Sequence, residues 1–254
     1  MTEFTIRTAG RVIRVGAQYE STRNFCREYL TADEPELSVS VDAADIAAEK
    51  QRLLAAAVRQ GEDPLPCTDG YAEILTVCRK LAEAMPAFGT VLFHGSAVAV
   101  DGAAYLFTAP SGTGKSTHTR LWREMLGARA VMVNDDKPFL RCGETGVTVC
   151  GSPWNGKHRL SSPISVPLKA ICLLERGKEN SIVPITFREA FPTLVRQCYR
   201  PMEKDALMQT MRLLGSMEHT VCFYRLACNM DPEAAAVSYG AMSRGSGYIR
   251  EDEV

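Results

Sequence analysis

The chain opens with residues that alternate between hydrophobic and polar. Residues 4–15 and 36–42 alternate in this way, which predicts half-buried strands. Residues 41–61 and 72–85 instead repeat apolar side chains at helical spacing, which predicts two amphipathic helices. Asp42 stands where an N-cap of the first helix is needed, and Gly61 where that helix should stop. Residues 1–88 therefore predict a small α+β region.

Short and strongly apolar runs begin after Gly89. Asp101-Gly102 joins two of them, which is a strong signal for a β-hairpin, and Glu144-Thr145-Gly146 predicts a second one. Further runs predict strands at 128–136, 168–176 and 219–229, and apolar spacing predicts helices at about 115–126, 187–199, 204–217 and 231–242. In the last helix, Asp231 is expected to be the cap and Pro232 the first residue. We therefore expect an α/β core at 89–243 with a mixed sheet, followed by a flexible polar tail at 244–254.

Composition narrows the possible partners and the cellular compartment. The chain holds 29 Lys and Arg against 30 Asp and Glu, without a block of like charge, so nothing in the sequence favours nucleic acid or an anionic membrane as a partner. The N-terminus lacks the features of a signal peptide, and no apolar run is long enough to span a membrane. Nine cysteines scatter without a CxxC pair. We therefore expect a cytoplasmic protein.

Residues 109–116, APSGTGKS, are close to the phosphate-loop pattern G-x-x-x-x-G-K-S/T, with Ala109 in place of the first glycine. The two glycines allow successive backbone N–H groups to face an anion, and the helix that follows adds its positive end. Ala109 fits if its φ is negative. A chance match in a flexible loop is the alternative, but the apolar run before the motif and the helix after it favour a nucleotide site. We expect seven residues to bind the nucleotide: Ser111, Gly112, Thr113, Gly114, Lys115, Ser116 and Thr117.

Two acids end the apolar run that follows the loop helix. Asp135 and Asp136 stand about twenty residues after Ser116, where a magnesium-binding carboxylate is expected in such proteins. A solvated turn would give the same pattern. Two adjacent acids can serve separately, one as a metal ligand and the other as the acceptor of a proton. We expect Asp135 to be the general base and Asp136 to bind the metal together with Ser116.

Two further segments contribute candidate residues. His94 ends the apolar run 91–93, and the Asp101-Gly102 hairpin brings that run close to the phosphate loop, so His94 is a candidate catalytic residue as well as a candidate core residue. Residues 151–159, GSPWNGKHR, form a shaped basic turn. Lys157 and Arg159 are expected to contact the acceptor or the transferring phosphoryl group; an exposed turn packed over Trp154 is the alternative.

This order of motifs resembles HPr kinase/phosphorylase: His94-Gly95-Ser96, a hairpin, the phosphate loop, one helix, and Asp135-Asp136. It is also similar to the nucleotide half of ATP-dependent phosphoenolpyruvate carboxykinase. The resemblance implies a kinase core of that type, with ATP on the loop and catalytic roles for Lys115, His94 and the two acids. It also implies a serine-type hydroxyl acceptor and a possible homo-oligomer. The family's Arg-Gly signature has no clear match here.

We therefore expect an ATP- and Mg²⁺-dependent kinase that phosphorylates a serine-type hydroxyl group on a protein or peptide. The residues themselves indicate only phosphoryl transfer, whereas the resemblance implies the class of acceptor. Two alternatives stay open. One is a kinase for a small-molecule hydroxyl, or a carboxykinase-like enzyme, and the other is a nucleotide-binding regulatory module without turnover.

Overall fold

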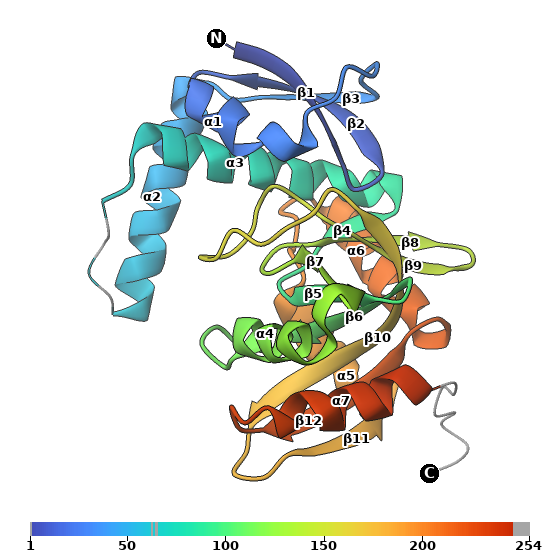
Figure 1. The fold of residues 1–254 in the computed structure, drawn as a ribbon. Coiled ribbons are helices and arrows are strands. Elements are labelled where there is room, and N and C mark those ends of the chain that lie inside the picture. The colour runs from blue at the N-terminus through green and yellow to red at the C-terminus, as the bar shows by residue number, and fades with distance from the viewer. Residues whose placement is uncertain (1, 62, 64–65, 246–254) are drawn as a thin grey trace. The chain divides into compact units, whose positions relative to one another are not determined.

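The computed structural model describes residues 2–61, 63 and 66–245, which divide into two compact units, Met1–Ala84 and Met85–Val254 (Figure 1). The division falls between helix α3 (Asp69–Ala84) and the 3₁₀ turn η2 (Met85–Phe88). The turn belongs to the second unit because it packs against α6 (Lys204–Gly215) and β4 (Thr90–Leu92). Among the described helices, none has both the length and the apolar character needed to cross a bilayer.

The first unit consists of a three-stranded sheet and helices. Strand β1 (Thr2–Thr8) pairs antiparallel with β2 (Arg11–Ala17), which pairs parallel with β3 (Leu37–Ser40). Residues 4–15 are strand for most of their length, as predicted, but they belong to two strands, because Ala9 and Gly10 both adopt positive φ and turn the chain back. The remaining elements are α1 (Glu20–Phe25), η1 (Arg27–Tyr29), α2 (Ala43–Gln60) and α3.

The predicted ends of helix α2 are confirmed. Asp42 accepts a hydrogen bond from the backbone N–H of Asp45, and the Asp45 side chain accepts one from the N–H of Asp42, which completes a capping box. Gly61 ends the helix in the left-handed conformation that glycine adopts without strain.

The second unit is a mixed α/β fold with a curled sheet. Besides β4, its strands are β5 (Ser96–Val100), β6 (Ala103–Thr108), β7 (Ala130–Asn134), β8 (Phe139–Gly143), β9 (Gly146–Cys150), β10 (Ser165–Arg176), β11 (Ser181–Ile185) and β12 (Cys222–Cys228). Strand β10 begins beside β9, to which it is antiparallel, and continues between β6 and β12, to which it is parallel. This change of partners lets one long strand join the two parts of the sheet. The strand order is β4-β8-β9-β10-β6-β5-β7; β12 also pairs with β10, and β11 pairs with β12.

Helices cover both faces of this sheet. Alternate residues along β5, β6 and β10 enter two different apolar clusters, as the twofold repeat of a strand requires. One cluster includes side chains of α4 (Lys115–Leu126) and α7 (Glu233–Arg244), and the other includes those of α5 (Phe187–Gln197) and α6. Strands β5, β6 and β10 are therefore buried on both sides.

The two predicted hairpins are confirmed, since β5 pairs with β6 around Asp101-Gly102 and β8 pairs with β9 up to Gly146. The predicted cap of the last helix is wrong. Helix α7 begins at Glu233 with Pro232 in the N-cap position, while Asp231 accepts a hydrogen bond from the side chain of Asn229. Of the predicted tail 244–254, residues 246–254 lie outside the described part of the chain.

Candidate functional site

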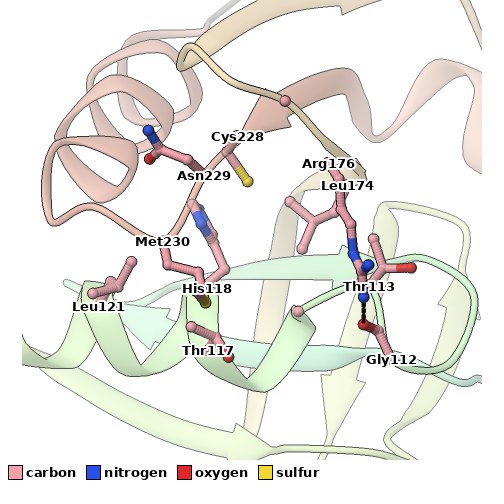
Figure 2. A pocket seen from close by; sticks show the side chains of 12 residues that line it. Gly112, Thr113, Thr117, His118, Leu121, Leu174, Arg176, Cys228, Asn229 and Met230 are labelled. Atoms are coloured by element: carbon pink, nitrogen blue, oxygen red, sulfur yellow. Dashed lines mark hydrogen bonds between the residues drawn. The ribbon is translucent and has the colours of Figure 1, made fainter.

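The loop between β6 and α4 contains two glycines with positive φ. Gly112 has φ +76° and Gly114 has φ +118°, a region that side chains strongly disfavour. Ala109 is buried and, unlike Ala9, Asp101 and Arg159, is not among the described non-glycine residues with positive φ. An alanine therefore fits at the first position of the loop. The guanidinium of Arg176, at the end of β10, donates a hydrogen bond of 2.7 Å to the carbonyl oxygen of Gly112 (Figure 2).

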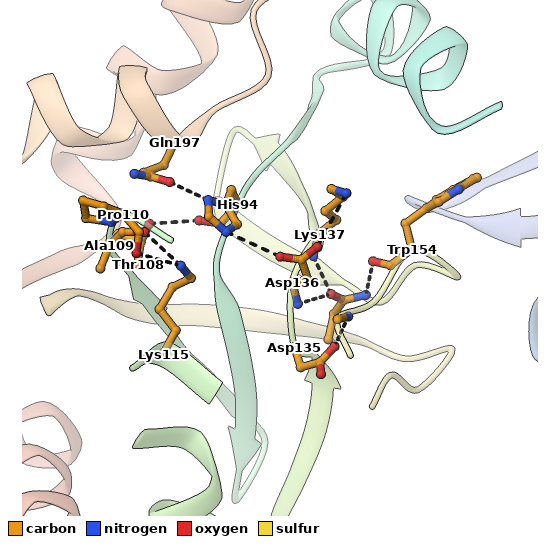
Figure 3. A network of polar contacts seen from close by, with 12 residues as sticks. His94, Thr108, Ala109, Pro110, Lys115, Asp135, Asp136, Lys137, Trp154 and Gln197 are labelled. Atoms are coloured by element: carbon orange, nitrogen blue, oxygen red, sulfur yellow. Dashed lines mark hydrogen bonds and ion pairs between the residues drawn. The ribbon is translucent and has the colours of Figure 1, made fainter. Parts of the chain in front are cut away.

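Lys115, the first residue of α4, folds back over this loop. Its ammonium group donates hydrogen bonds to the carbonyl oxygens of Ala109 (2.9 Å) and Pro110 (3.4 Å) (Figure 3). Burial lowers the pKa of Lys115, and the negative charge of Asp136 opposes this shift. Ser111 and Gly112 are exposed, and Ser116 and Thr117 are half-buried in the first turn of α4. The loop thus presents a cation, hydroxyl groups and a helix N-terminus at one place.

His94 links three elements of the second unit. Its backbone N–H donates to the carbonyl of Gln197 (2.8 Å), and its Nδ1 lies 2.7 Å from Oε1 of that glutamine, the last residue of α5. Its own carbonyl accepts a hydrogen bond from the hydroxyl of Thr108, at the end of β6. Its Nε2 lies 3.4 Å from Oδ1 of Asp136. Burial and the charge of Lys115 lower the pKa of His94, while Gln197 and Asp136 oppose the shift.

Asn134 organises the segment that carries the two acids. Its buried side chain accepts hydrogen bonds from the backbone N–H groups of Asp136 (2.9 Å) and Lys137 (2.7 Å). Its amide nitrogen donates to the carbonyl oxygens of Ser152 and Trp154. One side chain therefore fixes the turn after β7 and holds the 151–159 segment against it.

Asp135 is a buried carboxylate with only one of its oxygens bonded. Its Oδ1 accepts a 2.5 Å hydrogen bond from the backbone N–H of Gly156, and its Oδ2 has no partner among the described residues. Burial raises the pKa of Asp135, and the neighbouring charge of Asp136 raises it further. A Cβ at Gly156 would lie 3.1 Å from that Oδ2, so the close approach depends on glycine. The free oxygen is chemically suited to accept a proton or to bind a cation.

Lys157 and Arg159 lie on the exposed turn that follows Gly156. Arg159 has φ +51°, and within the described residues neither side chain forms an ion pair. The turn therefore places two positive side chains within three residues of the glycine that contacts Asp135. Lys137 adds a third, since its Nζ lies 3.5 Å from Oδ2 of Asp136.

Sequence reasoning missed several residues that shape this site. Gln197 lies 103 residues from His94 and Arg176 lies 64 residues from Gly112, and no local pattern marks either of them. Asn134 had a usable signal, because a polar side chain stood between a buried strand and two acids. The same applies to Gly156, which stood in a segment already marked as a shaped loop.

The donor set suits a hard cation. The described residues contain no group of three or more His, Cys, Asp or Glu side chains that could hold a metal ion. Mg²⁺ does not need such a cage, because it usually takes one or two carboxylates and completes its shell with water and substrate phosphates. The Asp136 carboxylate, the Ser116 hydroxyl and the unpartnered Oδ2 of Asp135 are oxygen donors of the kind that Mg²⁺ prefers.

Neither a protein-family model nor a curated protein sequence matches this chain. A distant structural neighbour is the Hpr(Ser) kinase/phosphatase from Coxiella burnetii, which is 12% identical in sequence. The match covers 49% of this chain and 93% of that one, with a TM-score of 0.29. A similarity this low supports no functional conclusion, so phosphoryl transfer is argued below from the geometry of the site, and the class of acceptor from the resemblance of the sequence motifs.

Proposed function

We propose that this protein is an ATP- and Mg²⁺-dependent phosphotransferase that phosphorylates a serine-type hydroxyl group on a protein or peptide. The observation that carries the proposal is the convergence of a loop lysine, a histidine and two acids. Lys115 influences the pKa of His94, and His94 Nε2 lies 3.4 Å from Asp136. Phosphoryl transfer requires such a set of groups, because it depends on positioning and on neutralising charge.

The donor would bind at the Ser111–Thr117 segment. Backbone N–H groups around Gly112 and Gly114 would face the phosphates, and Lys115 would exchange its carbonyl partners for phosphate oxygens. Asp136 and Ser116 would hold Mg²⁺, which neutralises phosphate charge when it is bound. His94, itself held by Gln197, would keep the Asp136 carboxylate in position.

Asp135 would act as the general base. Its pKa is raised and its Oδ2 lacks a hydrogen-bond partner among the described residues, so this oxygen would take the proton of the acceptor hydroxyl. The acceptor oxygen then bonds to the γ-phosphorus, the bond from that phosphorus to the bridging oxygen breaks, and ADP leaves with the electron pair. Lys157 and Arg159 would stabilise the negative charge of the transferring group. The serine-type acceptor is what the family resemblance implies.

Removing each carboxylate separately tests the proposal. Asp135→Asn and Asp136→Asn should each lower Mg²⁺-dependent turnover of γ-labelled ATP by about 10²–10⁴-fold. Both variants should still bind ATP, measured by calorimetry. Asp205→Asn, which removes an exposed carboxylate on α6, is the matched control and should keep full activity. Normal turnover in both site variants would disprove the mechanism.

A further inference from the structure

The turn at residues 157–159 is bonded at both of its ends to the proposed base. Before the turn, the backbone N–H of Gly156 donates to Oδ1 of Asp135 at 2.5 Å. After it, the carbonyl oxygen of Leu160 accepts a 3.0 Å hydrogen bond from the backbone N–H of the same aspartate. The three residues between these two bonds therefore lie next to the carboxylate.

Each of these three residues carries a basic side chain, and all three are exposed: Lys157, His158 and Arg159. Burial raises the pKa of Asp135, and the positive charge of His158 opposes this shift. The backbone N–H of Arg159 closes the turn by donating to the carbonyl of Gly156 at 3.0 Å. Its φ of +51° is rare outside glycine, and such strained residues occur often at functional sites. The turn thus holds positive charge at a defined place beside the base.

Few acids balance this charge along the chain. From Lys137 to Lys169 the sequence contains five Lys or Arg residues and a single acid, Glu144, although the whole chain has 29 Lys and Arg against 30 Asp and Glu. Glu144 lies at the tip of the β8–β9 hairpin. Lys137 belongs to the same basic surface as the turn, because its carbonyl accepts a hydrogen bond from the hydroxyl of Ser152, in the segment that leads to the turn (Figure 3).

A peptide that brings a hydroxyl group to Asp135 has to pass beside these side chains. The proposed function assigns Lys157 and Arg159 to the transferring phosphoryl group and leaves Lys137 and His158 without a role. Carboxylates near the acceptor hydroxyl would be attracted to this surface, whereas lysines and arginines would be repelled. Such complementarity selects between partners and speeds their encounter.

We propose that the acceptor hydroxyl belongs to an acidic peptide segment, and that the turn at 157–159, together with Lys137, binds the carboxylates that flank it. The inference rests on the proposed function, because it names the class of segment that this site phosphorylates. The guanidinium of Arg159 has several N–H groups, so it can bind a carboxylate of the acceptor while it contacts the transferring group.

A degenerate library of serine peptides tests this preference with the full chain. In each pool, one position beside the serine is fixed to one amino acid, and the transfer of labelled γ-phosphate from ATP is measured with Mg²⁺. At one or more positions, pools with Asp or Glu should accept at least about fivefold more phosphate than pools with Asn or Gln, and pools with Lys or Arg should accept less. Because the basic side chains are exposed, the preference should weaken between about 0.05 M and about 0.5 M salt.

The best acidic peptide and its neutral counterpart, with Asn or Gln in place of each acid, then test the turn itself. Lys157→Gln and Arg159→Asn should each lower the ratio of the two kcat/KM values towards one, besides any loss of rate that both peptides share. Asparagine tolerates the left-handed conformation, so the second variant removes charge with little added strain. Arg188→Gln, which removes an exposed charge from α5, is the matched control and should keep the wild-type ratio.

The outcomes separate this inference from the proposed function. Equal labelling of acidic and neutral pools, or an unchanged ratio in both turn variants, would overturn the acidic acceptor and leave the phosphotransferase proposal standing. A preference for Lys or Arg beside the serine would overturn it in the same way. Transfer of phosphate to none of the pools would overturn the proposed peptide acceptor and this inference together.

Discussion

At the scale of single residues, the approach of Gly156 to Asp135 is the most demanding contact in the site. An added Cβ would meet Oδ2 at 3.1 Å and both Cγ and Oδ1 at 3.3 Å, so the carboxylate has to move. A displacement of about 1 Å at a reacting group can cost 10²-fold in rate. The carboxylate needs to shift by a few tenths of an ångström, so Gly156→Ala should lower turnover by about three- to tenfold and leave the Kd for ATP within about twofold of wild type. Gly215→Ala, where an added Cβ meets nothing within 4 Å, should be silent, and equal activity in the two variants would remove Gly156 from the mechanism.

His118 gives a second prediction at this scale, and it concerns stability. The ring is buried, its Nε2 lies 2.9 Å from the Ser238 hydroxyl, and its Nδ1 has no partner among the described residues. Burial lowers the pKa of His118 to about 4. Below the ordinary value of 6.5, the unfolded chain therefore takes up a proton that the folded chain refuses. The free energy of unfolding should fall as the pH drops from 6.5 towards 4, by on the order of 1 kcal/mol per pH unit.

Denaturant unfolding between pH 7 and pH 5, without nucleotide or Mg²⁺, measures this slope. His118→Gln should reduce it, whatever the variant does to stability at pH 7. His219→Gln, which removes an exposed imidazole, should keep the wild-type slope. Equal slopes in wild type and His118→Gln would contradict the assignment.

At the scale of elements, helix α1 depends on a side chain from another helix. It begins without a side-chain cap of its own. Glu73, fully buried on α3, instead accepts hydrogen bonds from the backbone N–H groups of Gln18 and Tyr19 and from the hydroxyl of Thr22. Glu73→Ala would leave the buried Thr22 hydroxyl and two partly buried backbone N–H groups without a partner, so it should lower the free energy of unfolding by about 2–4 kcal/mol. Glu34→Ala, at an exposed position in the same unit, should cost less than about 0.5 kcal/mol. Equal losses in the two variants would rule out this capping role.

Elements with local signals could be predicted from the sequence, and contacts between distant segments could not. The caps of α2 and both hairpins follow from residues within a few positions of one another. The turn that divides the predicted strand residues 4–15 could not be predicted, because Ala9 turns together with Gly10 and alanine rarely adopts positive φ. In the site, the motif marked Lys115 and the acids, but the glutamine that holds His94 comes from the end of α5, and its position depends on how that helix packs on the sheet.

At the scale of the whole molecule, the second unit has a core of its own. The two apolar clusters on the faces of its sheet take all their buried members from residues 91–242. Every residue of the candidate site, from His94 to Gln197, lies within the same unit. A unit of this size buries enough apolar surface to fold alone.

A fragment that begins at Met85 should therefore fold and bind the donor without residues 1–84. We expect cooperative thermal unfolding, followed by circular dichroism, and a Kd for ATP within about threefold of the full chain. Lys115→Met in the fragment should weaken ATP binding by at least about tenfold, because it removes the charge that faces the phosphates. This loss would show that ATP binds at the loop and not elsewhere on the surface of the fragment. A fragment that unfolds without cooperativity would mean that the first unit completes the core. A folded fragment that no longer binds ATP would instead mean that residues 1–84 contribute directly to the nucleotide site.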